Sequence, residues 1–373
     1  MWKKCALGDL VTFQRGYDLP KTQMKEGPYP VIGSNGIIGY HNEYTIKGPV
    51  VTIGRSGNVG NPFIVYGNAW AHNTTLYVKE FKRSNPIFIY YLLKTLNLGN
   101  YAGGSAVPTL NRNHIHSLPV IVPESIEEQK WIGEFLKLFD DKIVLNNKIN
   151  DNLEQQAQAY FQKLFIDNKD PQWKKGTISD LGEVVGGGTP SKKKTEYYCN
   201  NGIAWITPKD LSLTKAKFIS HGETDISLSG FENSSVKLLP EGAVLFSSRA
   251  PIGYIAIAAN EVTTNQGFKS VIPKRNIGTA FVYYFLKSNL LVIEGMASGS
   301  TFKEVSGRIM KQVPVIIPDQ NTLNKFNEFC KPILIQQKIL EKQNHELAIL
   351  RDSLIPKLIS ENMDFNEVTS LSC

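Results

Sequence analysis

The chain has few cysteines, 4 in 373 residues, and Cys5, Cys199, Cys330 and Cys373 lie far apart. Neither a Cys-x-x-Cys motif nor a Cys/His spacing typical of a zinc site is present. We therefore expect reduced thiols and a cytoplasmic protein. No apolar run approaches the about 18 residues that a membrane-spanning helix needs, so we also expect no membrane segment.

The motifs of the common enzyme classes are missing as well. Gly54, Gly57 and Gly60 do not have the spacing of a dinucleotide-binding Gly-x-Gly-x-x-Gly motif. There is neither a Walker A sequence nor a Gly-x-Ser-x-Gly nucleophile motif. His114 and His116 have no third metal ligand near them in the sequence. We therefore expect no catalytic residue, no metal site and no cofactor on this chain.

Acidic residues are fewer than basic ones, 34 against 41, which gives a formal net charge of +7. The excess lies in two segments: residues 1–123 contain 12 basic and 5 acidic residues, and residues 166–318 contain 18 and 13. A basic balance indicates an acidic partner such as nucleic acid, although a charge excess by itself is often only a solubility feature.

The most regular stretch is Glu124–Phe165, which contains no proline. Its apolar residues recur every three or four positions, as on one face of an α-helix, and the other positions are mostly polar or charged. About 42 residues form a helix of roughly 60 Å, which is longer than the core of one domain. The predicted face comprises Ile132, Leu136, Phe139, Ile143, Asn146, Ile149, Leu153, Ala157, Tyr160 and Leu164.

A second copy of this pattern follows at an offset of 194, over residues 319–360, so that Ile132 maps to Phe326. Pro332 and Pro356 are expected to kink this second helix or to start it locally. The alternative is two unrelated surface helices, each buried on its own domain.

The segments that precede the two helices also repeat each other. Both are predicted to contain short strands of Val, Ile and Tyr, joined by tight turns with Gly and Pro. The clearest match is Phe88–Lys94 against Phe281–Lys287, predicted to be helical in both copies. Most of the extra residues of the second copy fall between Thr207 and Val244.

The predicted fold class is α+β, with two pseudo-twofold-related α/β domains of short mixed or antiparallel strands, separated by a long antiparallel two-helix coiled coil. Asn150 and Asn344 could set the register between the helices as polar residues in their contact, or could lie solvated at its edge. The predicted segments are a first domain (1–123), a first long helix (124–165), a second domain (166–318), a second long helix (319–360) and a tail (361–373).

Polar residues recur in the loops of both copies. Arg can bond guanine through two donors, Asn or Gln can bond adenine, and Ser, Thr and Lys suit phosphates. The alternative is that loop Asn and Ser close turns and that the lysines are merely solvated. The candidate DNA-binding residues are Arg55, Ser56, Asn58, His72 and Asn73 in the first domain and Lys192, Lys193, Lys209, Ser248, Arg249, Asn265 and Gln266 in the second.

Several strings, in this order and in a duplicated frame, resemble the specificity subunits of type I restriction-modification systems over nearly the whole chain. Glu128-Gln129, after the last predicted strand of the first domain, matches the entry of that family into its first helix. The other strings are Tyr29–Tyr40, Ile53–Gly57, Pro119–Pro123, Gly187–Ser191, Gly202–Ile206, Gly242–Arg249 and Asn265–Phe268.

This resemblance implies two target-recognition domains that each read one half of a bipartite double-stranded DNA site, with the helices setting the spacer. It also implies two methyltransferase subunits, which supply S-adenosylmethionine chemistry, and restriction subunits, which supply ATP- and Mg-dependent cleavage. The two domains differ in length and loop sequence, so we expect an asymmetric target. The alternatives are a coiled-coil adaptor that does not bind DNA and a self-sufficient modification enzyme.

Overall fold

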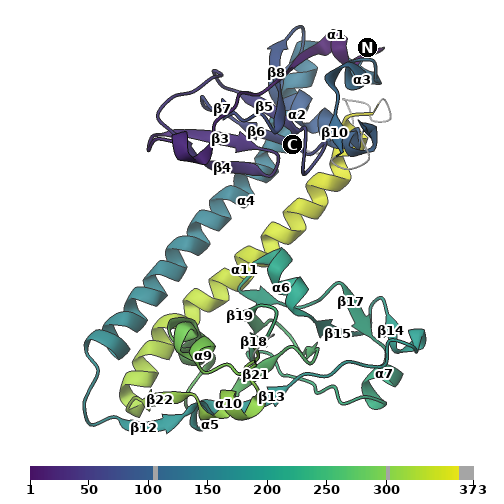
Figure 1. Ribbon diagram of the computed structural model, residues 1–373. Helices are drawn as coiled ribbons and strands as arrows, with labels where there is room; N and C mark the ends of the chain where they lie inside the picture. Colours follow the sequence, from purple (N-terminus) through teal and green to yellow (C-terminus); the bar gives the residue numbers. More distant parts are fainter. Residues whose placement is uncertain (104–107, 300–302, 361–373) are drawn as a thin grey trace, which may run out of the picture. The chain divides into compact units, whose positions relative to one another are not determined.

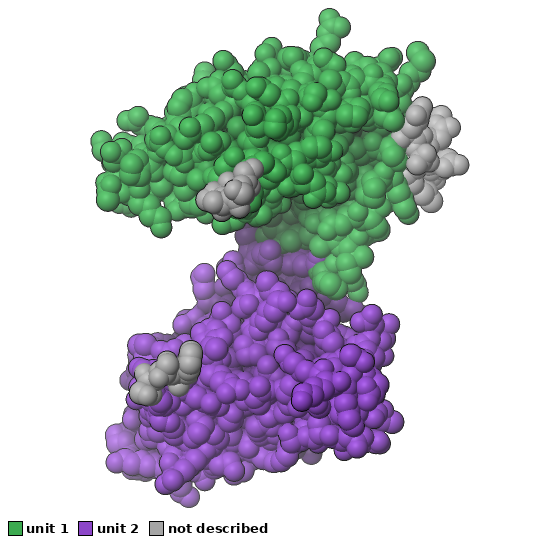
Figure 2. All heavy atoms as spheres, turned by 45° about the vertical axis from the view of Figure 1, so that its right-hand side comes forward, with its two compact units in different colours: residues 1–144, 345–373 green, residues 145–344 purple. Residues whose placement is uncertain are grey.

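The chain folds into two compact units, which are coloured separately in Figure 2. Unit 1 comprises residues 1–144 and 345–373, and unit 2 comprises residues 145–344. The computed structural model describes residues 1–103, 108–299 and 303–360 (Figure 1).

Some sequence predictions fall outside these described residues, namely the loops at Gly104-Ser105 and Ser300, Cys373 and the tail after Ser360. Cys5, Cys199 and Cys330 are free thiols. Within the described ranges, none of the helices combines the length and the apolar character that a membrane crossing requires.

Unit 1 contains the strands β1 (Trp2–Ala6), β2 (Val11–Arg15), β3 (Tyr29–Gly33), β4 (Gly36–His41), β5 (Val50–Gly54), β6 (Pro62–Val65), β7 (Trp70–Ala71), β8 (Thr75–Phe81), β9 (Ala102–Gly103), β10 (Thr109–Leu110) and β11 (Pro119–Pro123). Its main sheet is antiparallel in the order β2-β8-β5-β6, and a second sheet has the order β4-β3-β7. All residues of the central strand β5 are buried, and its sequence is apolar except for Thr52. Asn35-Gly36, a dipeptide typical of hairpin turns, joins β3 to β4, with Gly36 at a φ of +94°.

The helices of unit 1 before the long one are α1 (Leu7–Leu10), α2 (Pro86–Thr95) and α3 (Arg112–His116). Asn85 and Pro86 mark the start of α2. The Asn85 side chain accepts hydrogen bonds from the Ile87 and Phe88 amides at 3.0 and 3.1 Å, and Pro86 occupies the first turn. Its buried residues Phe88 and Leu92 belong to the core of unit 1. The helix predicted here is therefore confirmed.

Unit 2 contains β12 (Lys174–Thr177), β13 (Gly182–Gly186), β14 (Tyr198–Cys199), β15 (Ile203–Ile206), β16 (Phe218–Ile219), β17 (Thr224–Ile226), β18 (Val244–Ser248), β19 (Ile252–Ala258), β20 (Thr263–Thr264), β21 (Lys269–Pro273) and β22 (Pro314–Ile317). Its short helices are α5 (Ile178–Leu181), α6 (Pro208–Thr214), α7 (Leu228–Glu232), α8 (Thr279–Ser288), α9 (Leu290–Gly295) and α10 (Gly307–Gln312). The sheet order β13-β21-β18-β19 repeats that of unit 1, and β16 extends it. The elements α6, β16, β17 and α7 lie within the extra residues 207–244, as the comparison of the two copies predicted.

The two long helices are α4 (Ile126–Phe161), which continues as a π-helix over Gln162–Asp167, and α11 (Gln320–Leu358). They run antiparallel in unit 2, since Asn146 bonds Asn344 whereas Asn150, further along α4, is bonded by Gln337, which comes earlier in α11. In unit 1, Asp140 of α4 pairs with Arg351 of α11.

Of the two alternatives expected for Pro332 and Pro356, a local start of the second helix is wrong, because α11 passes through both residues, and a kink stays a prediction. A proline removes one backbone hydrogen bond, and the buried face of Phe326, Cys330 and Ile333 outweighs that loss.

Two predictions about the helix contact are corrected by the structure. Asn146, not Asn150, is the fully buried polar residue in it, and its Nδ2 donates to Oδ1 of Asn344 at 2.9 Å. Asn150 instead accepts a bond at its backbone oxygen from Gln337, at 3.2 Å. Ile149 is 37% exposed and lies off the buried face. The repeat of 3.6 residues drifts along a long helix, so sequence spacing cannot select between neighbouring positions.

The joint between the sheet domain of unit 2 and the long helices is a buried ionic cluster around Glu154 of α4. Lys217 pairs with Glu154 and donates to the Tyr284 hydroxyl at 2.9 Å and to Gln337 at 2.8 Å. Lys287 of α8 reaches the other carboxylate oxygen at 2.6 Å. Burial raises the pKa of Glu154, but Lys217 and Lys287 outweigh it and lower the pKa to about 2.

We expect unit 2 to lose stability in acid because of this cluster. The folded-state pKa of Glu154 lies below its ordinary value of 4.5, so its contribution is present above pH 4.5 and is lost as the pH falls toward about 2. Chemical denaturation at several pH values between these limits measures the slope. Glu154→Gln is expected to flatten it, and an equal slope in that variant would assign the acid loss to other groups.

Candidate nucleic-acid interface

A polar loop occupies the same place in the sheet domain of each unit. In unit 1 it follows β7, which pairs in parallel with β3, and the His72 amide donates to the Ile32 carbonyl at 2.9 Å. In unit 2 it follows β20, which pairs in parallel with β15, and the Asn265 amide donates to the Ile206 carbonyl at 3.0 Å. Position 72 therefore corresponds to position 265 in the structure.

A glycine packs against this loop in both units. A Cβ atom at Gly16 would collide with the backbone of His72, and one at Gly187 would collide with the backbone of Asn265. In both copies the amide of the next residue donates a hydrogen bond to the short strand. Tyr17 bonds the Ala71 carbonyl at 2.8 Å, and Gly188 bonds the Thr264 carbonyl at 2.9 Å. The duplication thus preserves a specific backbone arrangement around the loop.

The structure brings four of the predicted residues of unit 1 together. The Arg55 and Ser56 amides both donate to the Thr74 carbonyl, at 2.8 and 3.2 Å, and Arg55 Nη1 donates to the Asn73 carbonyl at 3.4 Å. His72 shares a hydrogen bond with the Thr74 hydroxyl at 3.0 Å. Burial lowers the pKa of His72, which favours a neutral ring at pH 7.

Asn58 is exposed and lies apart from this group. It lines a polar hollow of about 390 Å³ together with Asn61, Lys94, Asn97 and Asn100. The predicted polar residues of unit 1 therefore face two surfaces.

Sequence reasoning missed an aromatic and acidic border of the unit 1 loop. The Asn73 side chain donates to Asp18, and the Tyr17 ring meets Trp70 edge-on with 6.4 Å between centroids. The Tyr17 hydroxyl also lies 3.2 Å from that of Tyr77. Residues 17 and 18 directly follow Arg15-Gly16, which precedes the strands of the first copy as Gly187-Gly188 precedes those of the second, so this correspondence was the available signal.

In unit 2, the four predicted residues Lys192, Lys209, Asn265 and Gln266 line one cavity of about 220 Å³. Gln266 is exposed and contacts the Thr189 hydroxyl. Lys209 pairs with Glu223 at 2.5 Å, and this hydrogen bond raises the pKa of Lys209.

Three other predicted residues of unit 2 stand outside this cavity. Arg249 is half-buried and its Nη1 lies 3.4 Å from Glu304. Lys193 is exposed. Ser248 is fully buried and its hydroxyl donates to the Gly267 carbonyl at 3.0 Å, a bond between two distant segments that leaves this side chain facing inward.

The Asn265 side chain closes a turn, because its Oδ1 accepts the Gly267 amide at 2.8 Å. Its Nδ2 group is not used in that bond. A residue missed by the sequence analysis, Asp210, fixes the wall of the cavity: it accepts the amide and hydroxyl of Thr207 at 2.7 and 2.6 Å and the Glu223 amide at 2.8 Å.

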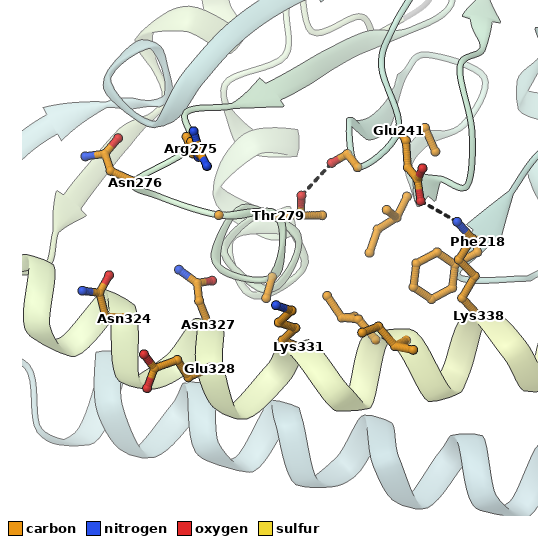
Figure 3. Close-up of a pocket in the computed structure, with 17 residues that line it drawn as sticks. Phe218, Glu241, Arg275, Asn276, Thr279, Asn324, Asn327, Glu328, Lys331 and Lys338 are labelled. Carbon is orange, nitrogen blue, oxygen red and sulfur yellow. Dashed lines mark hydrogen bonds and ion pairs between the residues drawn. The ribbon is translucent and has the colours of Figure 1, made fainter.

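A second hollow of unit 2, of about 460 Å³, lies between α11 and the start of α8 (Figure 3). Phe218, Ile257 and Leu334 contribute apolar surface to it, and Glu241 and Lys338 pair at 2.5 Å at its border. This hollow contains none of the predicted DNA-binding residues. No group of His, Cys, Asp and Glu suited to a metal ion occurs in the part of the chain that the structure describes.

The structure thus contains two copies of a sheet domain. Each copy presents polar loops at the same edge and is joined to paired helices. This arrangement defines a duplicated recognition protein, and its described residues contain no metal cluster. Residues 1–155 and 171–347 match the family model of the type I restriction modification DNA specificity domain. The chain therefore belongs to this family, and the resemblance inferred from the sequence is confirmed. DNA sequence specificity is the role that this membership supports, and the adaptor alternative is not favoured.

Individual relatives agree with this assignment. The MjaIX specificity subunit of Methanocaldococcus jannaschii is 38% identical over 199 residues, covering 51% of this chain and 46% of that protein. The EcoR124I/EcoR124II specificity subunit of Escherichia coli is 24% identical over 330 residues, covering 78% and 79%. The chain thus spans about half of the first relative and most of the second.

Among solved structures, the S subunit of a type I restriction-modification system from M. genitalium has a TM-score of 0.65 at 16% identity. The alignment covers 98% of this chain and 97% of that one. At this identity the similarity concerns the fold, and it confirms the predicted α+β class with two domains and long helices.

Proposed function

We propose that this chain gives a type I restriction-modification complex its DNA sequence specificity, with each unit reading one half of an asymmetric bipartite site. The observation that supports this most is the repeated polar loop, positioned in both units by the same glycine and the same parallel strand pair. The loops carry different side chains, His72-Asn73 in one and Asn265-Gln266 in the other, so the two half-sites should differ.

The chemistry of the loops suits duplex DNA. Among the described residues, the Arg55 guanidinium donates one bond, at 3.4 Å to the Asn73 carbonyl, and a planar guanidinium can bond two acceptors of guanine. Lys192 and Lys193 are exposed and suit phosphates, so this part of the binding should weaken as salt rises.

The reactions would belong to other subunits. We propose that the chain is not itself catalytic, acts in the cytoplasm, and assembles with two methyltransferase subunits and with restriction subunits. S-adenosylmethionine, ATP and Mg²⁺ would then be bound by those partners.

Exposed apolar side chains on the long helices support docking of the methyltransferase subunits. Soluble proteins rarely leave such groups uncovered in clusters. The apolar floor and mixed charges of the hollow beside α11 also suit a protein partner more than a nucleic acid. The exposed residues are Leu138, Val144, Ile349 and Leu350 in unit 1 and Leu145, Ile149, Ile335 and Ile339 in unit 2.

The half-site assignment is tested by two arginine substitutions. Arg55→Ala is expected to weaken recognition of one half-site, and Arg249→Ala that of the other, by ~1–3 kcal/mol if each contacts a base. Methylation by the reconstituted complex on DNA with each half-site randomised in turn measures this. Arg83→Ala, at an exposed position after β8, is the matched control. Unchanged base preference in both variants would make the loops structural.

A further inference from the structure

A pair of adjacent tyrosines is repeated on the helix that packs against the long helices, Tyr90-Tyr91 in α2 and Tyr283-Tyr284 in α8. In both units the second tyrosine donates a hydrogen bond to a carboxylate on α4. The Tyr91 hydroxyl lies 2.6 Å from Asp140, and the Tyr284 hydroxyl lies 2.8 Å from Glu154. DNA recognition by the loops requires neither contact.

The same carboxylate is also held by a cation in each unit. In unit 1, Arg351 of α11 pairs with Asp140. In unit 2, Lys217 and Lys287 pair with Glu154, and Lys217 also bonds Gln337 of α11 at 2.8 Å. Each carboxylate therefore links the domain helix to α4. It also links both to α11, directly in unit 1 and through Lys217 in unit 2.

These contacts are directional and partly or fully removed from water. Tyr91 and Tyr284 are 0% and 1% exposed. A hydrogen bond to a charged carboxylate is stronger than one between neutral groups. Asp140 and Glu154 are partly buried, with side chains 25% and 20% exposed, and a rotation of the domain on the helices would take their partners away. Such a cluster favours one orientation over others more than it adds to overall stability.

The first tyrosine of each pair differs from the second. Within the described residues, the Tyr90 and Tyr283 hydroxyls make no hydrogen bond. All four rings lie beside a lysine: Lys94 Nζ is 4.8 Å from the Tyr90 ring and 5.6 Å from the Tyr91 ring, and Lys217 Nζ is 4.8 Å from the Tyr283 ring and 5.0 Å from the Tyr284 ring. The hydrogen bond of the second hydroxyl is therefore what separates the two members of each pair. The chain thus supplies a matched control hydroxyl next to each bonded one.

We propose that Tyr91 with Asp140 and Tyr284 with Glu154 are positioning residues that fix each recognition domain on the paired helices and so limit the spacer lengths that the protein accepts. This inference rests on the proposed function, because a spacer exists only if the two units read separate half-sites.

The test uses the complete complex with its methyltransferase and DNA in which the spacer is one base pair shorter, native or one base pair longer. Tyr91→Phe and Tyr284→Phe are expected to retain methylation of the native site within about twofold. Relative to that site, they should methylate the altered spacers about tenfold better than the wild type does. Tyr90→Phe and Tyr283→Phe should keep the wild-type spacer profile.

Lys287→Gln provides a second variant if Tyr284→Phe does not fold, because it removes one half-exposed contact to Glu154 and should broaden the profile less. A profile of Tyr91→Phe and Tyr284→Phe identical to that of the control variants, even with a lower melting temperature, would overturn the proposal. A wild-type complex without preference for any bipartite site would instead refute the proposed function, so the two failures are distinguishable.

Discussion

Replacement of Phe326 by alanine is expected to lower the free energy of unfolding of unit 2 by about 3–5 kcal/mol. Phe326 is fully buried on α11. Its ring centroid lies 5.7 Å from that of Phe161, the last residue of α4, and 5.1 Å from that of Phe165 in the π-helix that follows. It also lies 6.0 Å from the ring of Tyr284 on α8. The truncation would leave a cavity where three helices meet, and rigid rings around it cannot collapse to fill it.

Phe329, three residues further along α11, is the control for this substitution. It is 39% exposed and contacts one aromatic ring, that of Tyr160, at 4.4 Å between centroids. Phe329→Ala is therefore expected to have a much smaller effect, about 1 kcal/mol or less. Urea denaturation followed by tryptophan fluorescence measures both variants. Equal losses for the two would contradict the assignment of Phe326 to the centre of this core.

Insertion of four residues into each long helix is expected to abolish methylation of the native site and to transfer it to a site with a longer spacer. Helix α4 contains residues of unit 1 up to Val144 and of unit 2 from Leu145, and α11 changes unit after Asn344. Matched insertions after positions 144 and 344 lengthen both helices by the same amount. Four residues add about 6 Å to each helix, and base pairs are about 3.4 Å apart.

The control for the insertion places the same four residues in the exposed turn at Asn260-Glu261, between β19 and β20. That chain should keep the native spacer. Mapping methylated positions in genomic DNA after co-expression with the methyltransferase compares the three proteins. A native spacer in the doubly extended chain would show that the helices do not set the distance between half-sites.

Local patterns predicted much of the fold. The periodicity of Glu124–Phe165 predicted α4 to within a few residues, because burial of one helix face repeats every 3.6 residues in any tertiary context. The Phe-x-Tyr-Tyr-x-Leu-Lys repeat predicted α2 and α8 for the same reason. The duplicated order of short apolar strings also indicated that the second domain would repeat the strands of the first.

The candidate site was predictable in position but not in detail. The residues around 55 and 73 and around 249 and 265 were identified by their type and their repetition. Which of them point outward depends on hydrogen bonds between segments far apart in the sequence. The Ser248 side chain, for example, points inward and bonds Gly267. Whether the predicted residues bind DNA remains a prediction, which the arginine substitutions test.

The sequence by itself determined the duplication, the helical periods and the family, because these depend on the order and spacing of residues along the chain. Only the tertiary structure decided that Asn146 rather than Asn150 meets Asn344, that Asp18 and Trp70 border the loop of unit 1, and that Lys217 joins Glu154. The physical reason is that a buried polar contact requires a partner brought by packing from far along the chain, and no local pattern records which partner arrives.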